Sequence, residues 1–226
     1  MKTSIRAEGC DARLVAGVVE AFDVQVDATA GALEEELTTT LRTLAESPDA
    51  GPPQAVRDAV RDLLRAAGYK PSGRGKPASE YLAGAAQKGA FPRISTLVDA
   101  ANLCSLRSGL PISLLDRTRA LEGTTGLVIR PGRSGERYVF NGAGQEIDVA
   151  GLLCVAREDG APVGNAVKDS LATRTDAATR AVLAVVWGST ACAPHVDVAH
   201  VTSALAAALV AHCAARDVTT AFVRGA

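Results

Sequence analysis

Polar side chains of several kinds gather between residues 162 and 180, directly before an apolar run. They supply amide, amine, carboxylate and hydroxyl groups from Asn165, Lys168, Asp169, Ser170, Thr173, Thr175 and Thr179. Functional sites are commonly built on loops at strand ends, because a rigid scaffold then holds the side chains in place. The same residues also suit a structural role, since Ser170 and Thr175 can each begin a helix. The stretch is therefore a candidate binding or catalytic site, with helix capping as the alternative.

A second set of polar residues interrupts the apolar segment from 91 to 116. This segment reads as one buried helix that ends at Gly109 and leaves through a proline. The interrupting residues are Asp99, Asn102, Ser105 and Arg107. A buried polar group without a partner costs about 1–3 kcal/mol, so these side chains must either bond within the fold or line a pocket.

Other kinds of chemistry find little support in the sequence. His200 and His212 lie on one predicted helix about 18 Å apart, so they cannot share a metal ion. Cys192, His195 and His200 match no familiar zinc spacing. There is no nucleophile elbow, phosphate-binding loop or dinucleotide fingerprint. We therefore expect neither a metal site nor an organic cofactor.

Charge is unevenly distributed along a nearly neutral chain. The formal net charge is −1, which excludes binding of polyanions by bulk electrostatics. Residues 65–93, however, include six basic residues and one acidic residue, and we call them the basic stripe. Arg74, Lys76 and Arg93 belong to it. The stripe predicts contact with the phosphates of a nucleic acid. A solvated loop rich in lysine and arginine is the alternative.

Length and composition indicate one globular domain. The 226 residues are 47% hydrophobic, enough for a sizeable core, and the low aromatic content of 4% predicts a core of alanine, valine and leucine. We expect an N-terminal lobe over 1–69 and a core over 70–226. Five widely spaced cysteines, a polar N-terminus and the absence of a long apolar run predict a cytoplasmic protein without membrane contact. The oligomeric state is left open.

Helical and alternating patterns are interspersed, which favours a mixed α+β fold over a doubly wound sheet. Helices are expected over 30–44, 53–67, 78–86, 94–108 and 198–215. Strands are expected over 2–7, 13–26, 127–130, 137–140, 152–156, 182–187 and 219–223. The strands 127–130 and 137–140 are expected to form a hairpin around 132–135. Residues 160–181 are expected to be mostly loop with a short helix.

Four segments in a fixed order resemble a known family. They are GRGKPASEYL at 73–82, PRISTLVDAANLCSLRSGLPISLLD at 92–116, GAGQE at 142–146 and NAVKDSLATRTDAATRAVL at 165–183. Together they are similar to the free-standing relatives of the B3/4 editing domain of the phenylalanyl-tRNA synthetase β subunit. The resemblance runs from about residue 70 to 215 and implies a three-layer α+β domain with helices flanking β-sheets.

The resemblance also implies roles for particular residues. Asn102, Glu146, Asn165 and Thr179 fall in motifs that surround the family's editing pocket, and Ser113 and Ser170 are assigned to substrate binding with Glu146 and Thr179. Asn102 and Asn165 would position the ester, Lys168 would stabilise the developing charge, and Asp169 would orient Lys168 or a water molecule. Ser113 stands where many synthetases have a histidine, and Val185 or a neighbour stands where they have a glutamate.

The function implied is hydrolysis of mischarged aminoacyl-tRNA in trans, with Arg74, Lys76 and Arg93 contacting the tRNA acceptor end. The main alternative is a module that binds tRNA, another RNA or an amino acid without catalysis, favoured if no polar group replaces the missing histidine and glutamate. A third reading is a transferase that passes the aminoacyl group to another acceptor and excludes water. Each reading requires that residue 102 and the segment 165–170 meet around one cavity.

Overall fold

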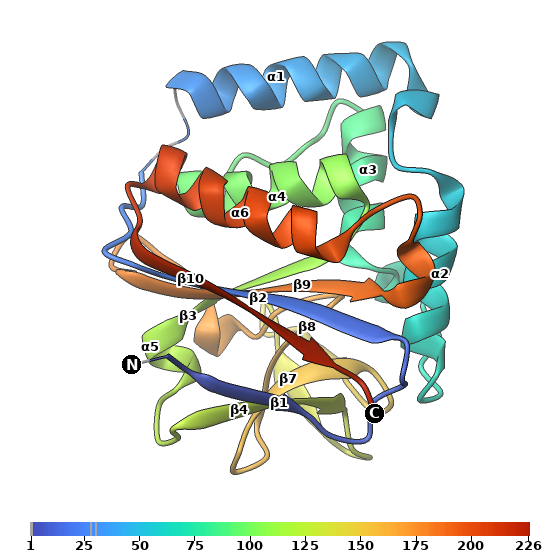
Figure 1. The fold of residues 1–226 in the computed structure, drawn as a ribbon, viewed down its shortest axis with the longest axis vertical. Helices are drawn as coiled ribbons and strands as arrows, with labels where there is room; N and C mark the ends of the chain where they lie inside the picture. Colours follow the sequence, from blue (N-terminus) through green and yellow to red (C-terminus); the bar gives the residue numbers. More distant parts are fainter. Residues whose placement is uncertain (1, 28, 30) are drawn as a thin grey trace.

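The computed structural model describes residues 2–27, 29 and 31–226 as three layers, a layer of helices above two stacked β-sheets (Figure 1). The middle sheet has the strand order β10-β2-β9-β3 and is antiparallel throughout. Its strands are β2 (Leu14–Phe22), β3 (Ile112–Asp116), β9 (Ala181–Ser189) and β10 (Arg216–Arg224). This architecture confirms the predicted three-layer α+β class.

The lower sheet has the order β1-β4-β7-β8, and β1 is parallel to β4. Its strands are β1 (Ser4–Ala7), β4 (Gly126–Pro131), β7 (Leu153–Arg157) and β8 (Pro162–Asn165). A separate two-stranded ribbon joins β5 (Arg137–Val139) to β6 (Glu146–Asp148). The first two strands of the chain thus belong to different sheets. Strand β1 is an edge of the lower sheet, and β2 lies between β9 and β10 in the middle sheet.

The helical layer covers the upper face of the middle sheet. Helices α4 (Thr96–Ser108) and α6 (Val198–Cys213) lie on the sheet, with α3 (Ala78–Gln87) beside α4 and α1 (Gly31–Glu46) above them, while α2 (Gln54–Arg65) stands at one end of the sheets (Figure 1). A short helix, α5 (Arg117–Ala120), follows β3. Single 3₁₀ turns occur at Pro48–Ala50, Gly73–Gly75, Leu171–Thr173 and Thr190–Cys192. The predicted start of the first helix at Ala30 lies outside the described residues.

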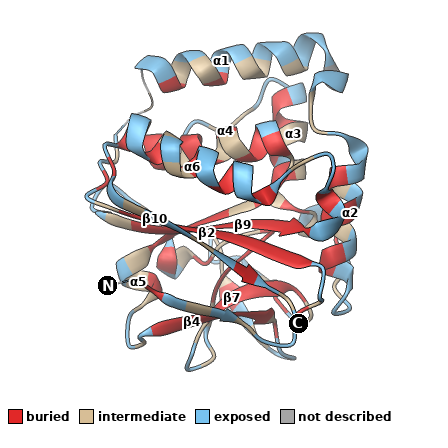
Figure 2. Ribbon diagram, viewed as in Figure 1, coloured by how far each residue is buried: buried red, intermediate tan, exposed pale blue. Residues whose placement is uncertain are grey.

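The two central strands of the middle sheet, β2 and β9, are buried on both faces (Figure 2). Along β9, Val182, Ala184 and Val186 belong to the apolar cluster beneath the helices, and Leu183, Val185 and Trp187 belong to the cluster above the lower sheet. Because successive side chains of a strand point to opposite faces, one continuous apolar run serves both cores. The sequence prediction of a strand buried on both faces is confirmed.

One buried ion pair ties the layers together. Glu20, 2% exposed on β2, accepts a bond from Arg117 Nε at 2.7 Å and bonds to the backbone and hydroxyl of Thr3 at the start of the lower sheet. Burial raises the pKa of the Glu20 carboxyl, but the bonds from Arg117 and Thr3 outweigh it and the pKa is lowered. The stabilisation by this carboxylate is therefore present at neutral pH and is lost on acidification.

Helix α4 ends at residue 108 as predicted and begins at Thr96, two residues after the predicted start. The Ser95 side chain accepts a bond from Val98 N–H at its start, and Gly109 ends it with a left-handed φ of 76°. A glycine adopts this conformation without steric cost. The second predicted strand is shorter than expected, because Asp23 turns the chain out of β2 with a φ of 54°.

The predicted hairpin between 127–130 and 137–140 is wrong. Strand β4 pairs with β1 and β7, while β5 pairs with β6. The tight turn lies instead at 141–144, where the Asn141 side chain accepts bonds from the N–H groups of Ala143 and Gln145. An asparagine that satisfies the backbone in this way stabilises a reversal of the chain.

Besides β6, which pairs with β5 in the ribbon, two strands of the larger sheets were not predicted. Residues 162–165, expected to be loop, form β8 at the edge of the lower sheet beside β7. Residues 112–116, expected only as the exit from the helix, form β3 at the edge of the middle sheet beside β9. Both are short strands of five residues or fewer, a length at which alternation is hard to recognise in a sequence.

Candidate functional site

A cavity of about 720 Å³ opens between α3, α4, β3 and the loop that follows β8. Its walls come from residues 73–82, 92–102, 112–114, 140–141 and 167–175, and we call it the main cavity. Leu82, Val98, Ala101, Ile112 and Leu114 give it an apolar lining. Each function expected from the sequence required residue 102 and the segment 165–170 to meet around one cavity. Asn102 and the loop 167–170 do line this cavity together.

The polar residues of α4 divide into structural ones and one that faces the main cavity. Asp99 is fully buried and accepts bonds from the Ile94 N–H and the Thr29 hydroxyl. Ser105 donates to the Leu110 carbonyl at 2.7 Å, and Arg107 pairs with Glu36 at 2.8 Å on the surface. Asn102 lines the main cavity, and its amide has no hydrogen-bond partner among the described residues. It is therefore available to a ligand.

Asn165 organises the loop from below and does not line the main cavity. Its side-chain oxygen accepts bonds from the N–H groups of Val167 at 2.7 Å and Lys168 at 2.8 Å, and its amide donates to the hydroxyl of Tyr138. Tyr138 in turn donates to the carbonyl of Lys168 at 2.6 Å. With an exposure of 2%, Asn165 fixes the position of Lys168 and does not touch a ligand in the cavity.

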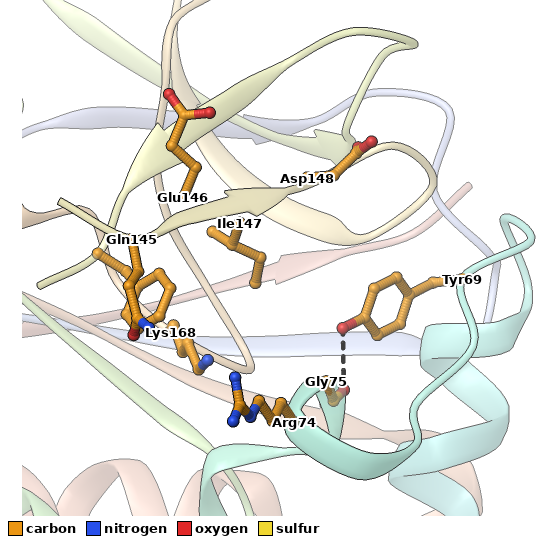
Figure 3. A pocket seen from close by; sticks show the side chains of 9 residues that line it. Tyr69, Arg74, Gly75, Gln145, Glu146, Ile147, Asp148 and Lys168 are labelled. Carbon is orange, nitrogen blue, oxygen red and sulfur yellow. Dashed lines mark hydrogen bonds between the residues drawn. The ribbon is translucent and has the colours of Figure 1, made fainter.

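Lys168 reaches the main cavity across the face of Phe140. The ammonium lies 3.9 Å from the centre of that ring, a favourable cation–π distance. Burial lowers the pKa of Lys168, and the nearby Arg74 guanidinium lowers it further. Figure 3 shows the two cationic groups side by side.

Asp169 places a carboxyl at the main cavity beside Lys168. Its two oxygens accept bonds from the N–H groups of Leu114 at 3.0 Å and Asn165 at 3.1 Å. Burial raises the pKa of this carboxyl to about 6, although the two backbone bonds favour the ionised form. Because the folded state binds this proton more tightly than the unfolded chain, the contribution of Asp169 to stability falls as the pH rises through 6.

The close fit of Asp169 depends on a glycine in β8. A Cβ atom at Gly164 would lie 2.7 Å from Asp169 Oδ1, so any larger residue would push the carboxyl out of place. Gly164 thus leaves the space in which Asp169 sits.

Four cations converge on the main cavity. Arg74 and Lys76 come from the turn before α3, and Lys168 and Arg174 come from the loop after β8. Within the part of the chain that the structure describes, none of the four forms an ion pair with a carboxylate. Arg65 and Arg93, from the same basic stripe, are instead paired with Asp62 and Glu34. The positive charge at this cavity is therefore open to an anion.

The structure places the other predicted site residues away from the main cavity or turned into the protein. Ser113 is fully buried between the Asn165 carbonyl and the Trp187 indole, and the buried Thr179 hydroxyl donates to Asp116 at 2.7 Å. Ser170 lies on the cavity wall but accepts a bond from Ala172 N–H. Glu146 lies in a neighbouring pocket, and Arg93 does not line the cavity.

Some cavity residues were missed from the sequence. Arg174, Phe140, Tyr81 and Ile94 all line the main cavity, and Tyr81 and Ile94 are 62% and 64% exposed. Tyr81, Ile94 and Arg174 lie within the sequence motifs that resemble the family, but only the fold shows which way their side chains point. No sequence motif pointed to Phe140, because its position at the cavity depends on the ribbon of β5 and β6.

The comparisons with known proteins include a distant structural likeness. The sequence matches no protein-family model and no curated protein. Among solved structures, the chain is similar to an N-terminal fragment of the phenylalanyl-tRNA synthetase β subunit from Pyrococcus horikoshii, with a TM-score of 0.48 and 9% identity. The match covers 96% of this chain and 50% of that fragment, so the chain spans half of its length. A likeness of this degree says nothing of chemistry, and the proposed function rests on the main cavity itself.

The described residues contain neither a metal-binding cluster of acidic, histidine or cysteine side chains nor a membrane-spanning helix. No group of three or more histidine, cysteine, aspartate or glutamate side chains in residues 2–27, 29 and 31–226 is arranged to hold a metal ion. Within the same residues, every helix is too short or too polar to cross a membrane.

Proposed function

We propose that the chain binds the aminoacyl end of a charged tRNA in the main cavity and hydrolyses the ester bond. The observation that carries this proposal is the convergence of an unpaired amide, an ammonium and a half-buried carboxyl, from Asn102, Lys168 and Asp169, on one apolar hollow. The resemblance of the sequence to B3/4 editing domains motivates the choice of tRNA.

The lining of the main cavity fits the two halves of such a substrate. The apolar wall of α3, α4 and β3 suits the side chain of an amino acid, because it offers a surface for desolvation. Arg74, Lys76 and Arg174 suit the phosphates of the attached RNA, since they lie at the same cavity without carboxylate partners in the described chain.

Hydrolysis requires a water, a proton acceptor and a donor for the developing oxyanion. In the proposed reaction Asp169 takes a proton from water as the water oxygen attacks the ester carbonyl. Lys168 and Asn102 stabilise the oxyanion, the bond to the ribose oxygen breaks, and Asp169 returns its proton to that oxygen as it leaves. An aminoacyl ester is already reactive, so this modest machinery suffices.

Binding without hydrolysis is the second candidate. It is favoured by the orientation of Ser113 and Thr179, which are bonded within the protein and contribute nothing to the cavity. On that reading the cavity holds a charged tRNA end, and Asp169 serves as a partner for the amino group of the amino acid.

A deacylation panel tests the proposal. The purified protein is incubated with a set of correctly and incorrectly charged tRNAs, and release of each amino acid is followed over time. We expect faster release from one or a few noncognate pairs than from the cognate ones. Tight tRNA binding with no release across the panel would refute hydrolysis and leave the binding module.

The pH dependence of hydrolysis tests the role of Asp169. Because a protonated carboxyl cannot accept a proton from water, the enzymatic rate is expected to fall about tenfold per pH unit below a pKa of about 6 and to level off above it. The rate is corrected at each pH for uncatalysed loss of the ester. The Asp169→Asn variant is expected to hydrolyse the ester slowly, and its pH–rate curve is expected to lack the inflection near pH 6. The same inflection in that variant would remove Asp169 from the mechanism.

A further inference from the structure

A second pocket of about 520 Å³ adjoins the main cavity, and we call it the side pocket (Figure 3). The two share Arg74, Phe140 and Lys168, which form the ridge between them. The other side of the side pocket is built by Tyr69 and by the strand β6 with the residue before it. A ligand that lies across the ridge would therefore enter both hollows.

The ridge carries two adjacent cations, Arg74 and Lys168, and neither forms an ion pair with a carboxylate of the described residues. Arg74 and Lys168 repel each other. Burial and this repulsion together lower the pKa of Lys168. The two acidic residues of the side pocket are engaged elsewhere. Glu146 pairs with Arg137 at 3.7 Å, and Asp148 accepts a bond from Ala150 N–H at 2.9 Å. An anion placed between Arg74 and Lys168 would relieve their repulsion, and a phosphate has the charge and the acceptors to do so.

The interior of the side pocket offers an aromatic face and an aliphatic floor. The Tyr69 hydroxyl donates to the Gly75 carbonyl at 2.9 Å, which fixes the ring at the edge of the opening. Ile147 points into the opening from β6, while Glu146 on the same strand points away from it (Figure 3). Lys168 already covers one face of Phe140, so Tyr69 supplies the free ring. Such a surface suits a planar base, because stacking on an aromatic ring is favourable for every base.

We propose that the side pocket binds a nucleoside monophosphate unit, with its phosphate between Arg74 and Lys168 and its base against Tyr69 and Ile147. The identity of this unit as the terminal nucleotide of a tRNA rests on the proposed function. The ridge then separates the base in the side pocket from the aminoacyl group in the main cavity, which places the ester beside Lys168.

Titration with adenosine monophosphate, adenosine and inorganic phosphate tests the inference on the full chain by calorimetry or nuclear magnetic resonance. The monophosphate is expected to bind at least tenfold more tightly than either of the other two. Tyr69→Leu and Ile147→Trp, which remove the ring and fill the floor, are expected to weaken monophosphate binding at least tenfold. Phe222→Leu, at an aromatic residue 45% exposed on β10, is the matched control and is expected to change nothing.

The outcomes separate this inference from the proposed hydrolysis. Monophosphate binding that is lost in Tyr69→Leu supports the side pocket even if the deacylation panel is silent. Hydrolysis that proceeds in Tyr69→Leu with unchanged KM, and a monophosphate that binds no better than phosphate alone, would overturn the side pocket and leave the hydrolase standing. A folded Ile147→Trp with full monophosphate affinity would also overturn it, with thermal unfolding as the check on folding.

Discussion

Lys168→Ala is expected to lower kcat for ester hydrolysis about 10²-fold, the usual loss when one donor to an oxyanion is removed. The ammonium makes no side-chain hydrogen bond within the described chain and rests on the Phe140 ring, so the free energy of unfolding is expected to change little. Asn102→Ala should behave in the same way, because its amide is also unpaired. The measurement is single-turnover hydrolysis of a charged tRNA that the panel has identified.

Two further variants show whether the loss in Lys168→Ala comes from removing the charge at this position. Lys168→Arg keeps the charge and should retain more activity than alanine, while Lys88→Ala, an exposed lysine outside the cavity, should retain all of it. A raised KM with unchanged kcat in Lys168→Ala would mean that Lys168 only binds phosphate. Unchanged kinetics in both Lys168→Ala and Asn102→Ala would place the active site elsewhere.

Asn165→Ala is expected to lower the free energy of unfolding by about 3 kcal/mol, because it strips the acceptor from two backbone N–H groups that the loop has turned inward. For a chain of this size the loss corresponds to roughly 6–12 °C in Tm. The loop that carries Lys168 and Asp169 should also lose its fixed position, so hydrolysis should fall with stability. Thermal and denaturant unfolding measure the first effect.

Tyr138→Phe is the matched control for this loop. It removes the hydroxyl that joins the Asn165 amide to the Lys168 carbonyl but leaves both N–H groups with their acceptor. Its loss of stability should therefore be smaller than that of Asn165→Ala. An equal loss in the two variants would show that the tyrosine hydroxyl, and not the asparagine oxygen, holds the loop.

The elements that the sequence predicted well are those with local signals. Helix α4 has a serine at its start and a glycine at its end, and β9 is an unbroken apolar run. The pairing of β4 with β1, by contrast, joins residues more than 100 positions apart, which no local pattern reveals. The glycines at 132 and 135 suggested a hairpin, but the reversal that pairs strands is made by Asn141.

For the candidate site, the sequence indicated the meeting of residue 102 with the loop after 165, but not the direction of each side chain. Ser113 shows why. It lies on β3 between Ile112 and Leu114, which face the main cavity, so strand alternation turns the serine toward Trp187. Without recognition of β3 as a strand, this orientation could not be derived. Thr179 was likewise assigned to the ligand, whereas it is the partner of Asp116.

The order of the middle sheet constrains how the protein is made. Strand β2, from the first 22 residues, lies between β9 and β10, the last of which ends at residue 224. During synthesis both edges of β2 therefore stay unpaired until β9 and β10, at residues 181–224, have left the ribosome. Contacts between residues so distant in sequence also slow the search for the native sheet. The nascent protein thus exposes an apolar strand that chaperones could shield until both neighbouring strands have emerged.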